Sequence, residues 1–329
     1  MRIFAYEHIT GGGLMDQSSH AALAPEGEAM LRALVRDLVA VPEVEAIAMR
    51  DPRLPLDLPA TMHVPESQRD FWPTFCRLVR ECDAVWLIAP EQDGILERLS
   101  REVIRAGRRL LGSWPDAVHV AASKLGSAAA LMAAGVHTIP TFADERSVPA
   151  DIEQIVVKPD DGAGCQDTYL FQRRVDLQRW LRDRASPGSV FQPYVRGGAL
   201  SLSILCCDGR ARLLAGNRQH VAISAGRFEF SGVSVNAIRD SDGRYAQLAR
   251  DVSRALPGLW GYVGIDVIDT VDGPVVVEIN PRLTTSYAGL RRALGINAAE
   301  LVLGLPGSLE DRASFGSAGV VDVEVAHAG

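Results

Sequence analysis

The stretch "IVVKPDDGAG", residues 155–164, contains one of only two lysines in the chain, Lys158. The second is Lys124, and the other 32 of the 34 basic residues are arginines. A chain that uses arginine everywhere else has no need of lysine for solubility. Lysine offers a compact point charge on a long flexible stem, whereas arginine presents a wide planar fork. We therefore expect Lys158 to make a specific contact with an anion.

The order of residues around Lys158 excludes the common phosphate-binding loops. Lys158 ends an apolar strand, and a turn containing Gly162 and Gly164 leads into another strand. A Walker loop places its lysine after the glycines and before a helix, and a GxGxxG motif opens a helix. A glycine turn between antiparallel strands can instead cover phosphates with its free N–H groups. Lys124, in the first turn of a predicted helix, could reach the same anion, although either lysine alone is more often a surface residue.

The regions on either side of this stretch follow different patterns. Strands and helices alternate over residues 1–113, which predicts a parallel, doubly wound sheet. After a predicted helix at 123–134, short strands separated by turn residues dominate, which indicates a mostly antiparallel α+β half. The expected strands are 2–9, 44–49, 83–89, 109–112, 154–158, 168–172, 190–194, 200–206, 212–217, 221–224, 227–232, 263–270 and 274–280.

Composition narrows the class of protein. With 329 residues, 47% hydrophobic and 23% charged, the chain has the composition of a soluble globular protein. Its net charge of −7 argues against a nucleic-acid partner. The first residues reach a charge too early for a signal peptide, and no apolar run approaches the ~20 residues that span a membrane. We expect a cytoplasmic protein with small-molecule partners, and the sequence is compatible with a homodimer.

The last strand carries oxygen ligands. In "VVVEINPR", residues 275–282, Glu278 and Asn280 lie two apart and share one face of the strand. A carboxylate beside an amide oxygen suits Mg²⁺, and Asp266 on the preceding strand could complete the set. A loop of three residues, 271–273, would pair Asp266 with Glu278, whereas a two-residue loop at 272–273 would turn it away. We predict the three-residue loop; the alternative is a solvated acid and amide on an edge strand.

An ordered set of motifs runs through the chain: Lys124 before "AAGVHTIP" (133–140), "KPDDGAG" (158–164), "QPY" (192–194), "GID" (264–266) and "EINPR" (278–282). This set resembles the ATP-grasp superfamily over nearly the full chain. The resemblance implies that ATP is bound by Lys124, Lys158, Gly162, Gly164 and a hinge of Gln192, Tyr194 and Val195. It also implies that Asp266, Glu278 and Asn280 hold Mg²⁺, which Mn²⁺ can replace. Many relatives carry a ribose-binding glutamate where this chain has Ala199.

The resemblance implies the fold and the domains. The expected class is α/β plus α+β in an ATP-grasp architecture. A parallel N-terminal α/β domain, a small lid subdomain and a mostly antiparallel C-terminal subdomain would span 1–113, 114–190 and 191–304, followed by a peripheral tail at 305–329.

Most ATP-grasp enzymes convert a carboxylate and ATP into an acyl phosphate, which an amine then attacks. By that analogy Arg218 and Arg282 are candidates to bind the acyl phosphate and the oxyanion. Gly12 and Gly13 follow the first strand, and Glu91 follows another parallel strand at the same edge, where ligands bind in doubly wound sheets. Glu91 could hold an ammonium group. A tight turn and a helix-start acid explain these residues equally well.

Within the superfamily, "EHITGGG", "APEQDGIL", "NRQ" and "EINPRLTTSYAGL" resemble the tyramine–glutamate ligases of methanofuran-type cofactor synthesis. That family joins the γ-carboxylate of glutamate to tyramine, and tyrosine is an alternative acceptor. The competing hypotheses are a ligase of another amino-acid pair and a nucleotide-binding regulator without catalysis. A dehydrogenase is disfavoured, because no GxGxxG opens a helix.

Overall fold

The computed structural model describes residues 1–16, 20–55, 57–162, 164–183, 188–305, 309 and 319–325. The N-terminal part contains a five-stranded sheet in the order β3-β2-β1-β4-β5, with every pair parallel. Its strands are β1 (Arg2–Glu7), β2 (Glu45–Met49), β3 (Thr61–His63), β4 (Ala84–Ile88) and β5 (Arg109–Leu110). The parallel sheet confirms the prediction for this half, although β3 was not among the expected strands.

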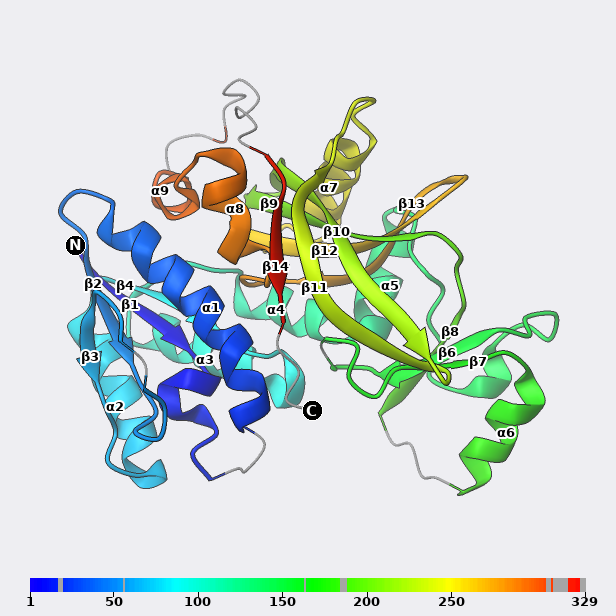
Figure 1. The fold of residues 1–329 in the computed structure, drawn as a ribbon, viewed down its shortest axis with the longest axis horizontal. Helices are drawn as coiled ribbons and strands as arrows, with labels where there is room; N and C mark the ends of the chain where they lie inside the picture. The colour runs from blue at the N-terminus through cyan, green and yellow to red at the C-terminus, as the bar shows by residue number, and fades with distance from the viewer. Residues whose placement is uncertain are drawn as a thin grey trace.

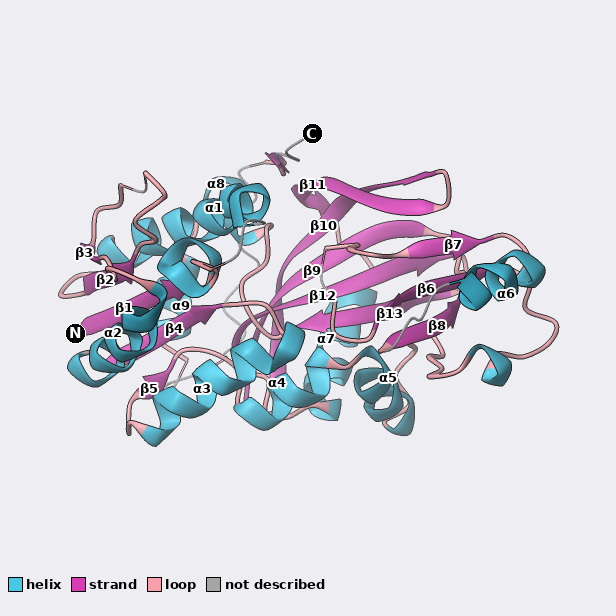
Figure 2. Ribbon diagram, turned by 90° about the horizontal axis from the view of Figure 1, so that it is seen from below, coloured by secondary structure: helices cyan, strands magenta, loops and turns pink. Residues whose placement is uncertain are grey.

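Helices cover both faces of this sheet (Figure 2). The apolar face of α1 (His20–Val39) packs against Ile3 and Ala5, whereas α2 (Gln68–Glu81) and α3 (Ile95–Arg105) pack against Phe4 and Tyr6 on the other face. Successive residues of a strand point to opposite faces, so β1 is buried on both sides. Its apolar run without alternation is the sequence pattern of such a strand.

The second sheet has nine strands in the order β13-β12-β9-β10-β11-β7-β6-β8, with β14 also paired to β11, and every pair is antiparallel. Its strands are β6 (Ile155–Pro159), β7 (Tyr169–Phe171), β8 (Ser189–Pro193), β9 (Gly198–Cys207), β10 (Arg210–Ser224), β11 (Arg227–Ile238), β12 (Gly261–Thr270), β13 (Gly273–Asn280) and β14 (Val321–Glu324). The strands expected at 212–217 and 221–224 are one continuous strand. β14 lies within the segment expected to be a peripheral tail, and it joins the sheet instead because its valines pair with β11. Most of that segment lies outside the described residues.

The remaining helices are α4 (Pro115–Ala122), α5 (Lys124–Ala133), α6 (Arg174–Asp183), α7 (Arg244–Ala255), α8 (Tyr287–Leu294) and α9 (Ala298–Leu303), with short turns η1 (Ile9–Gly13), η2 (Gln92–Gly94) and η3 (Glu145–Ser147). α8 and α9 share one apolar core with α1, β10 and β11, so the two halves of the molecule are joined through buried surface (Figure 1). α6 and strands β6 and β8 enclose a small separate core. No helix among the described residues is long and apolar enough to cross a membrane.

The connection between β12 and β13 differs from the prediction. Thr270 pairs with Gly273, so the loop contains only two residues. A bulge then shifts the register between the partners of Val267 and Asp266, with the result that Asp266 still pairs with Glu278. The predicted pairing is confirmed and the predicted three-residue loop is wrong. Because a bulge adds one residue to one strand, it replaces the extra loop residue and places Val277 on the same side as Glu278.

Candidate active site

The two lysines of the chain come together on the wall of one cavity of about 360 Å³. Lys158 lies near the end of β6, Lys124 begins α5, and each is 6% exposed. Burial lowers the pKa of Lys158 to about 8, with Glu278 opposing this shift and Lys124 adding to it. Two buried ammonium groups that face one cavity form a site for an anion.

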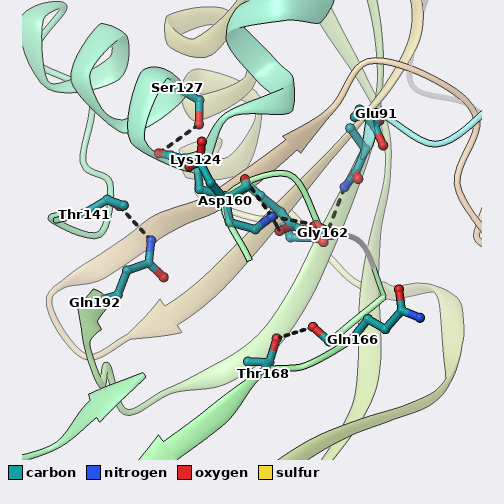
Figure 3. A network of polar contacts seen from close by, with 12 residues as sticks. Glu91, Lys124, Ser127, Thr141, Asp160, Gly162, Gln166, Thr168 and Gln192 are labelled. Carbon is teal, nitrogen blue, oxygen red and sulfur yellow. Dashed lines mark hydrogen bonds and ion pairs between the residues drawn. The ribbon is translucent and has the colours of Figure 1, made fainter. Parts of the chain in front are cut away.

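Lys124 holds the glycine turn, residues 160–162 and 164, against the start of α5 (Figure 3). Its Nζ donates to the carbonyl oxygens of Gly162 at 2.5 Å and Asp160 at 3.2 Å, and it lies 3.6 Å from the carboxylate of Glu278. The Asp160 carboxylate accepts the N–H of Leu125 at 2.8 Å. Gly162 and Gly164 line the cavity, as a phosphate-covering turn requires.

Asp266, Glu278 and Asn280 also line the cavity. The Asn280 amide donates to Asp266 Oδ2 at 3.4 Å. Burial and the charge of Glu278 raise the pKa of Asp266 well above its usual value. Burial alone would raise the pKa of Glu278 too, but the two lysines outweigh it and the pKa is lowered. Among the described residues no cluster of three His, Cys, Asp or Glu side chains could hold a metal ion. The candidate site differs, because it consists of two carboxylates and the amide oxygen of Asn280. Mg²⁺ accepts such a set of oxygen donors.

Gln219 belongs to this group, although it was not among the site residues predicted from the sequence. Its Nε2 donates to Asp266 Oδ1 at 2.9 Å and it lines the cavity. Gln219 directly follows Arg218, which is exposed and pairs with Leu200 on β9. Since neighbouring side chains on a strand point to opposite faces, only one of the two can face the cavity. The structure brings Gln219 to the site and not Arg218.

The expected adenine hinge lines the cavity at the end of β8. Gln192 donates its Nε2 to Thr141 Oγ1 at 2.7 Å (Figure 3), which fixes the orientation of the amide. Tyr194 and Val195 line the same wall together with Ile139 and Val156. Apolar side chains beside an oriented amide suit a purine base. Ala199 also lines the cavity, where it offers no polar contact to a ribose.

Arg282 lies at the cavity next to the N-terminal domain. Its Nε and Nη2 donate to Glu91 Oε2 at 3.2 and 3.0 Å, and the two side chains are 12% and 7% exposed. Burial alone would lower the pKa of Arg282, but Glu91 outweighs it and the pKa is raised. Glu91 Oε1 is buried and has no hydrogen-bond partner among the described residues. A buried carboxylate oxygen without a donor is costly. Glu91 contacts the cavity-lining Arg282 but is not itself among the described residues that line the cavity.

Gly12 and Gly13 lie in η1, and neither is among the described residues that line the cavity. Gly12 has a positive φ of 93°, and a Cβ on Gly13 would lie 2.1 Å from the His8 ring. Their glycine character therefore follows from a tight turn packed on His8. Glu26 and Thr285 do line the cavity. They were not predicted from the sequence, because α1 meets the loop after β13 only in the folded chain.

Residues 121–286 match the model of the ATP-grasp domain, and residues 44–118 match that of the pre ATP-grasp 3 domain. The first match covers half of the chain, and the chain belongs to the ATP-grasp family. Enzymes of this family are ADP-forming ligases, and its proteins bind ATP with Mg²⁺.

Several known proteins are similar. The tyramine–L-glutamate ligase of Methanocaldococcus jannaschii is 28% identical over 209 residues, which is 64% of this chain and 58% of the relative, so the match spans less than two thirds of that protein. An ATP-grasp superfamily protein from Archaeoglobus fulgidus superposes with a TM-score of 0.73 at 22% identity, over 99% of this chain and 100% of that one. The L-amino acid ligase of Bacillus licheniformis gives a TM-score of 0.62 at 16% identity, over 92% of this chain and 73% of the other. These structural similarities concern the fold.

Proposed function

We propose that this protein is an ATP- and Mg²⁺-dependent carboxylate–amine ligase that forms an amide through an acyl phosphate. The observation that carries the proposal is the convergence of Lys124, Lys158, Asp266, Glu278 and Asn280 on one cavity that also contains Arg282. A binding protein without catalysis needs the lysines but not a buried arginine beside the metal ligands. We therefore favour the ligase over the regulator.

Each group has a role in this reaction. Gln192, Tyr194 and Val195 orient adenine, and the two lysines bind phosphates under the glycine turn. Asp266, Glu278 and Asn280 would hold Mg²⁺, which when bound supplies charge neutralisation on the transferred phosphoryl group. Because such transfers depend mainly on positioning and electrostatics, these residues account for the first half-reaction.

Arg282 is placed to act in the second half-reaction. We expect its guanidinium to stabilise the acyl phosphate and the oxyanion that develops when the amine attacks. Glu91 holds Arg282 through Oε2, and its Oε1, unpaired among the described residues, would accept from a donor on the substrate, such as the ammonium group of an amino acid. The distant similarity to tyramine–L-glutamate ligase supports the γ-carboxylate of L-glutamate as the acid and tyramine or tyrosine as the amine, as in methanofuran or methylofuran-type cofactor biosynthesis.

Release of ADP tests the proposal. The enzyme would be incubated with Mg-ATP and glutamate, alone and with tyramine or tyrosine, and the product identified by mass spectrometry. We expect ADP release that depends on both substrates and a product with the mass of the amide. ADP release with a different amino-acid pair would support the proposed ligase activity but assign it other substrates. Tight ATP binding without turnover on any amino acid and amine would overturn the ligase and favour the regulator.

A further inference from the structure

We propose that Glu26 is a catalytic residue of the second half-reaction, the carboxylate that binds the ammonium group of the incoming amine and accepts its proton. This inference rests on the proposed ligase function and adds to it a site for a protonated primary amine. An amine that arrives as an ammonium ion has no lone pair for attack, so the reaction needs a proton acceptor at the cavity.

Three carboxylates are found among the described residues that line the cavity: Glu26, Asp266 and Glu278. Asp266 and Glu278 lie with Asn280 and the lysines, where they would be occupied by the metal. Glu26 comes from α1 in the N-terminal part, away from β12 and β13 in the chain (Figure 1). Of these three carboxylates, Glu26 is therefore the one available to bind a substrate cation.

Glu26 lies near the group that we expect to bind the acyl phosphate. Its negative charge acts on Arg282, as does that of Glu91. Two acids thus act on one arginine, so this group of three side chains retains negative charge when Glu91 is paired with the arginine. Such a place suits an ammonium group that must reach the carbonyl carbon next to Arg282. Oε1 of the buried Glu91, which has no hydrogen-bond partner in the part of the chain that the structure describes, is a second acceptor at the same arginine.

The Glu26 carboxylate is held in position from the other half of the molecule. Thr285, which is 8% exposed, donates its Oγ1 hydrogen to Glu26 Oε1. Thr285 lies three residues after Arg282, in the loop between β13 and α8. The same loop therefore carries the arginine and orients the proton acceptor. Glu26 itself is only half-buried, so a proton can pass from it to water.

The proposed step balances. The ammonium group gives one proton to Glu26, and its nitrogen then attacks the carbonyl carbon of the acyl phosphate. The C–N bond forms and the C–O bond to phosphate breaks. The second proton leaves the nitrogen as the amide forms and goes to the departing phosphate. Glu26 returns its proton to solvent, and no other reactant is needed.

Hydroxylamine provides a discriminating test, because it is largely unprotonated at neutral pH whereas a primary alkylamine is an ammonium ion. The enzyme would be given Mg-ATP, the amino acid that supports ADP release, and either tyramine or hydroxylamine. For Glu26→Gln we expect the ratio of amide to hydroxamate formation to fall by roughly 10²–10⁴-fold, the usual contribution of a general base. Glu28→Gln is the matched control, since Glu28 lies on the same helix and pairs with Arg32 at the surface.

A second variant guards against a folding defect. Thr285→Val keeps the carboxylate and removes the hydrogen bond that orients it, so the same ratio should fall by a smaller factor. An unchanged ratio in Glu26→Gln, or an equal loss with both nucleophiles, would overturn the inference while leaving the ligase intact. Absence of ADP release from the unaltered protein with every amino acid, with or without hydroxylamine, would overturn the proposed function and this inference together.

Discussion

At the scale of single residues, the site depends on charges that are buried together. Lys158 and Lys124 are nearly excluded from water, and the carboxylate of Glu278, whose pKa they lower, compensates part of their charge together with Asp266. Burial of like charges is unfavourable, and an anion bound between the lysines would stabilise the pair further. The rarity of lysine in the sequence already indicated these two positions. Nothing in the sequence indicated Glu26, and the motif "NRQ" at 217–219 contains Gln219 but does not show that Gln219, and not Arg218, faces the cavity.

Lys158→Arg should weaken nucleotide binding although the charge is kept. The longer, planar guanidinium does not fit a position shaped for an ammonium group, and we expect a loss of roughly 10-fold or more in affinity for Mg-ATP. Titration calorimetry with a non-hydrolysable ATP analogue measures this. Affinity equal to that of the unaltered protein would mean that the scarcity of lysine reflects codon usage and not chemistry.

The same variant tests the pKa of Lys158. Because that pKa is lowered to about 8, the ammonium group is charged below pH 8 and loses its proton above it. Affinity of the unaltered protein for the analogue should therefore fall as the pH rises from 7 to 9. Lys158→Arg should show no such fall over that range, since a guanidinium stays protonated. A parallel fall in both proteins would assign the titration to another group.

At the scale of elements, the glycine turn connects Lys124 to the loop that carries Glu91. Asp161 Oδ2 accepts the N–H of Asp93 at 3.0 Å, two residues after Glu91. Asp93 has a positive φ of 55°, a conformation that needs support in a non-glycine residue. The neighbouring Asp160 holds the start of α5 instead. The two aspartates of "KPDDGAG" thus hold the turn in two directions, a role that their position in the sequence does not indicate.

Asp161→Ala should loosen the loop that carries Glu91. Loss of a solvent-accessible hydrogen bond predicts roughly 3- to 10-fold faster amide exchange at residues 91–94 and a similar increase in KM for the amino acid. Hydrogen–deuterium exchange and steady-state kinetics measure these effects. Asp167→Ala, an exposed residue of the same connection, is the control. Equal exchange rates in the two variants would rule out the link.

At the scale of the whole molecule, the site exists because α1 joins the two halves. Asp37 on α1 accepts hydrogen bonds from Tyr287 and Arg291 of α8, both at 3.0 Å. Asn297 donates to the Asp37 carbonyl at 2.8 Å. These contacts fix α1 against the loop after β13, which places Glu26 beside Thr285. The apolar core that α1 shares with α8 and α9 supplies most of the attraction, and the polar contacts specify the alignment.

Asp37→Ala should lower the free energy of unfolding by about 1–3 kcal/mol, because the buried Tyr287 hydroxyl loses its acceptor. Urea unfolding followed by circular dichroism measures the change. Asp37→Asn keeps an oxygen that can accept from Tyr287 and should cost less. If the two variants were equally stable, the hydrogen bond from Tyr287 to Asp37 would make no contribution to the free energy of unfolding.

The sequence by itself predicted the parallel and antiparallel halves and singled out the two lysines, Glu278 and Asn280, because these depend on local patterns: apolar periodicity, residue usage and residues two apart on a strand. The hinge came from the resemblance to the ATP-grasp superfamily, and the roles of all these residues stay predictions. The domain boundaries stay a prediction as well. The tertiary structure decided the rest. A bulge at Val277 produced the pairing of Asp266 with Glu278 that the loop did not. Strand alternation selected Gln219 over Arg218, and helix packing brought Glu26 to Arg282 across more than 250 residues of chain. Such choices depend on contacts between distant segments, which no local pattern records.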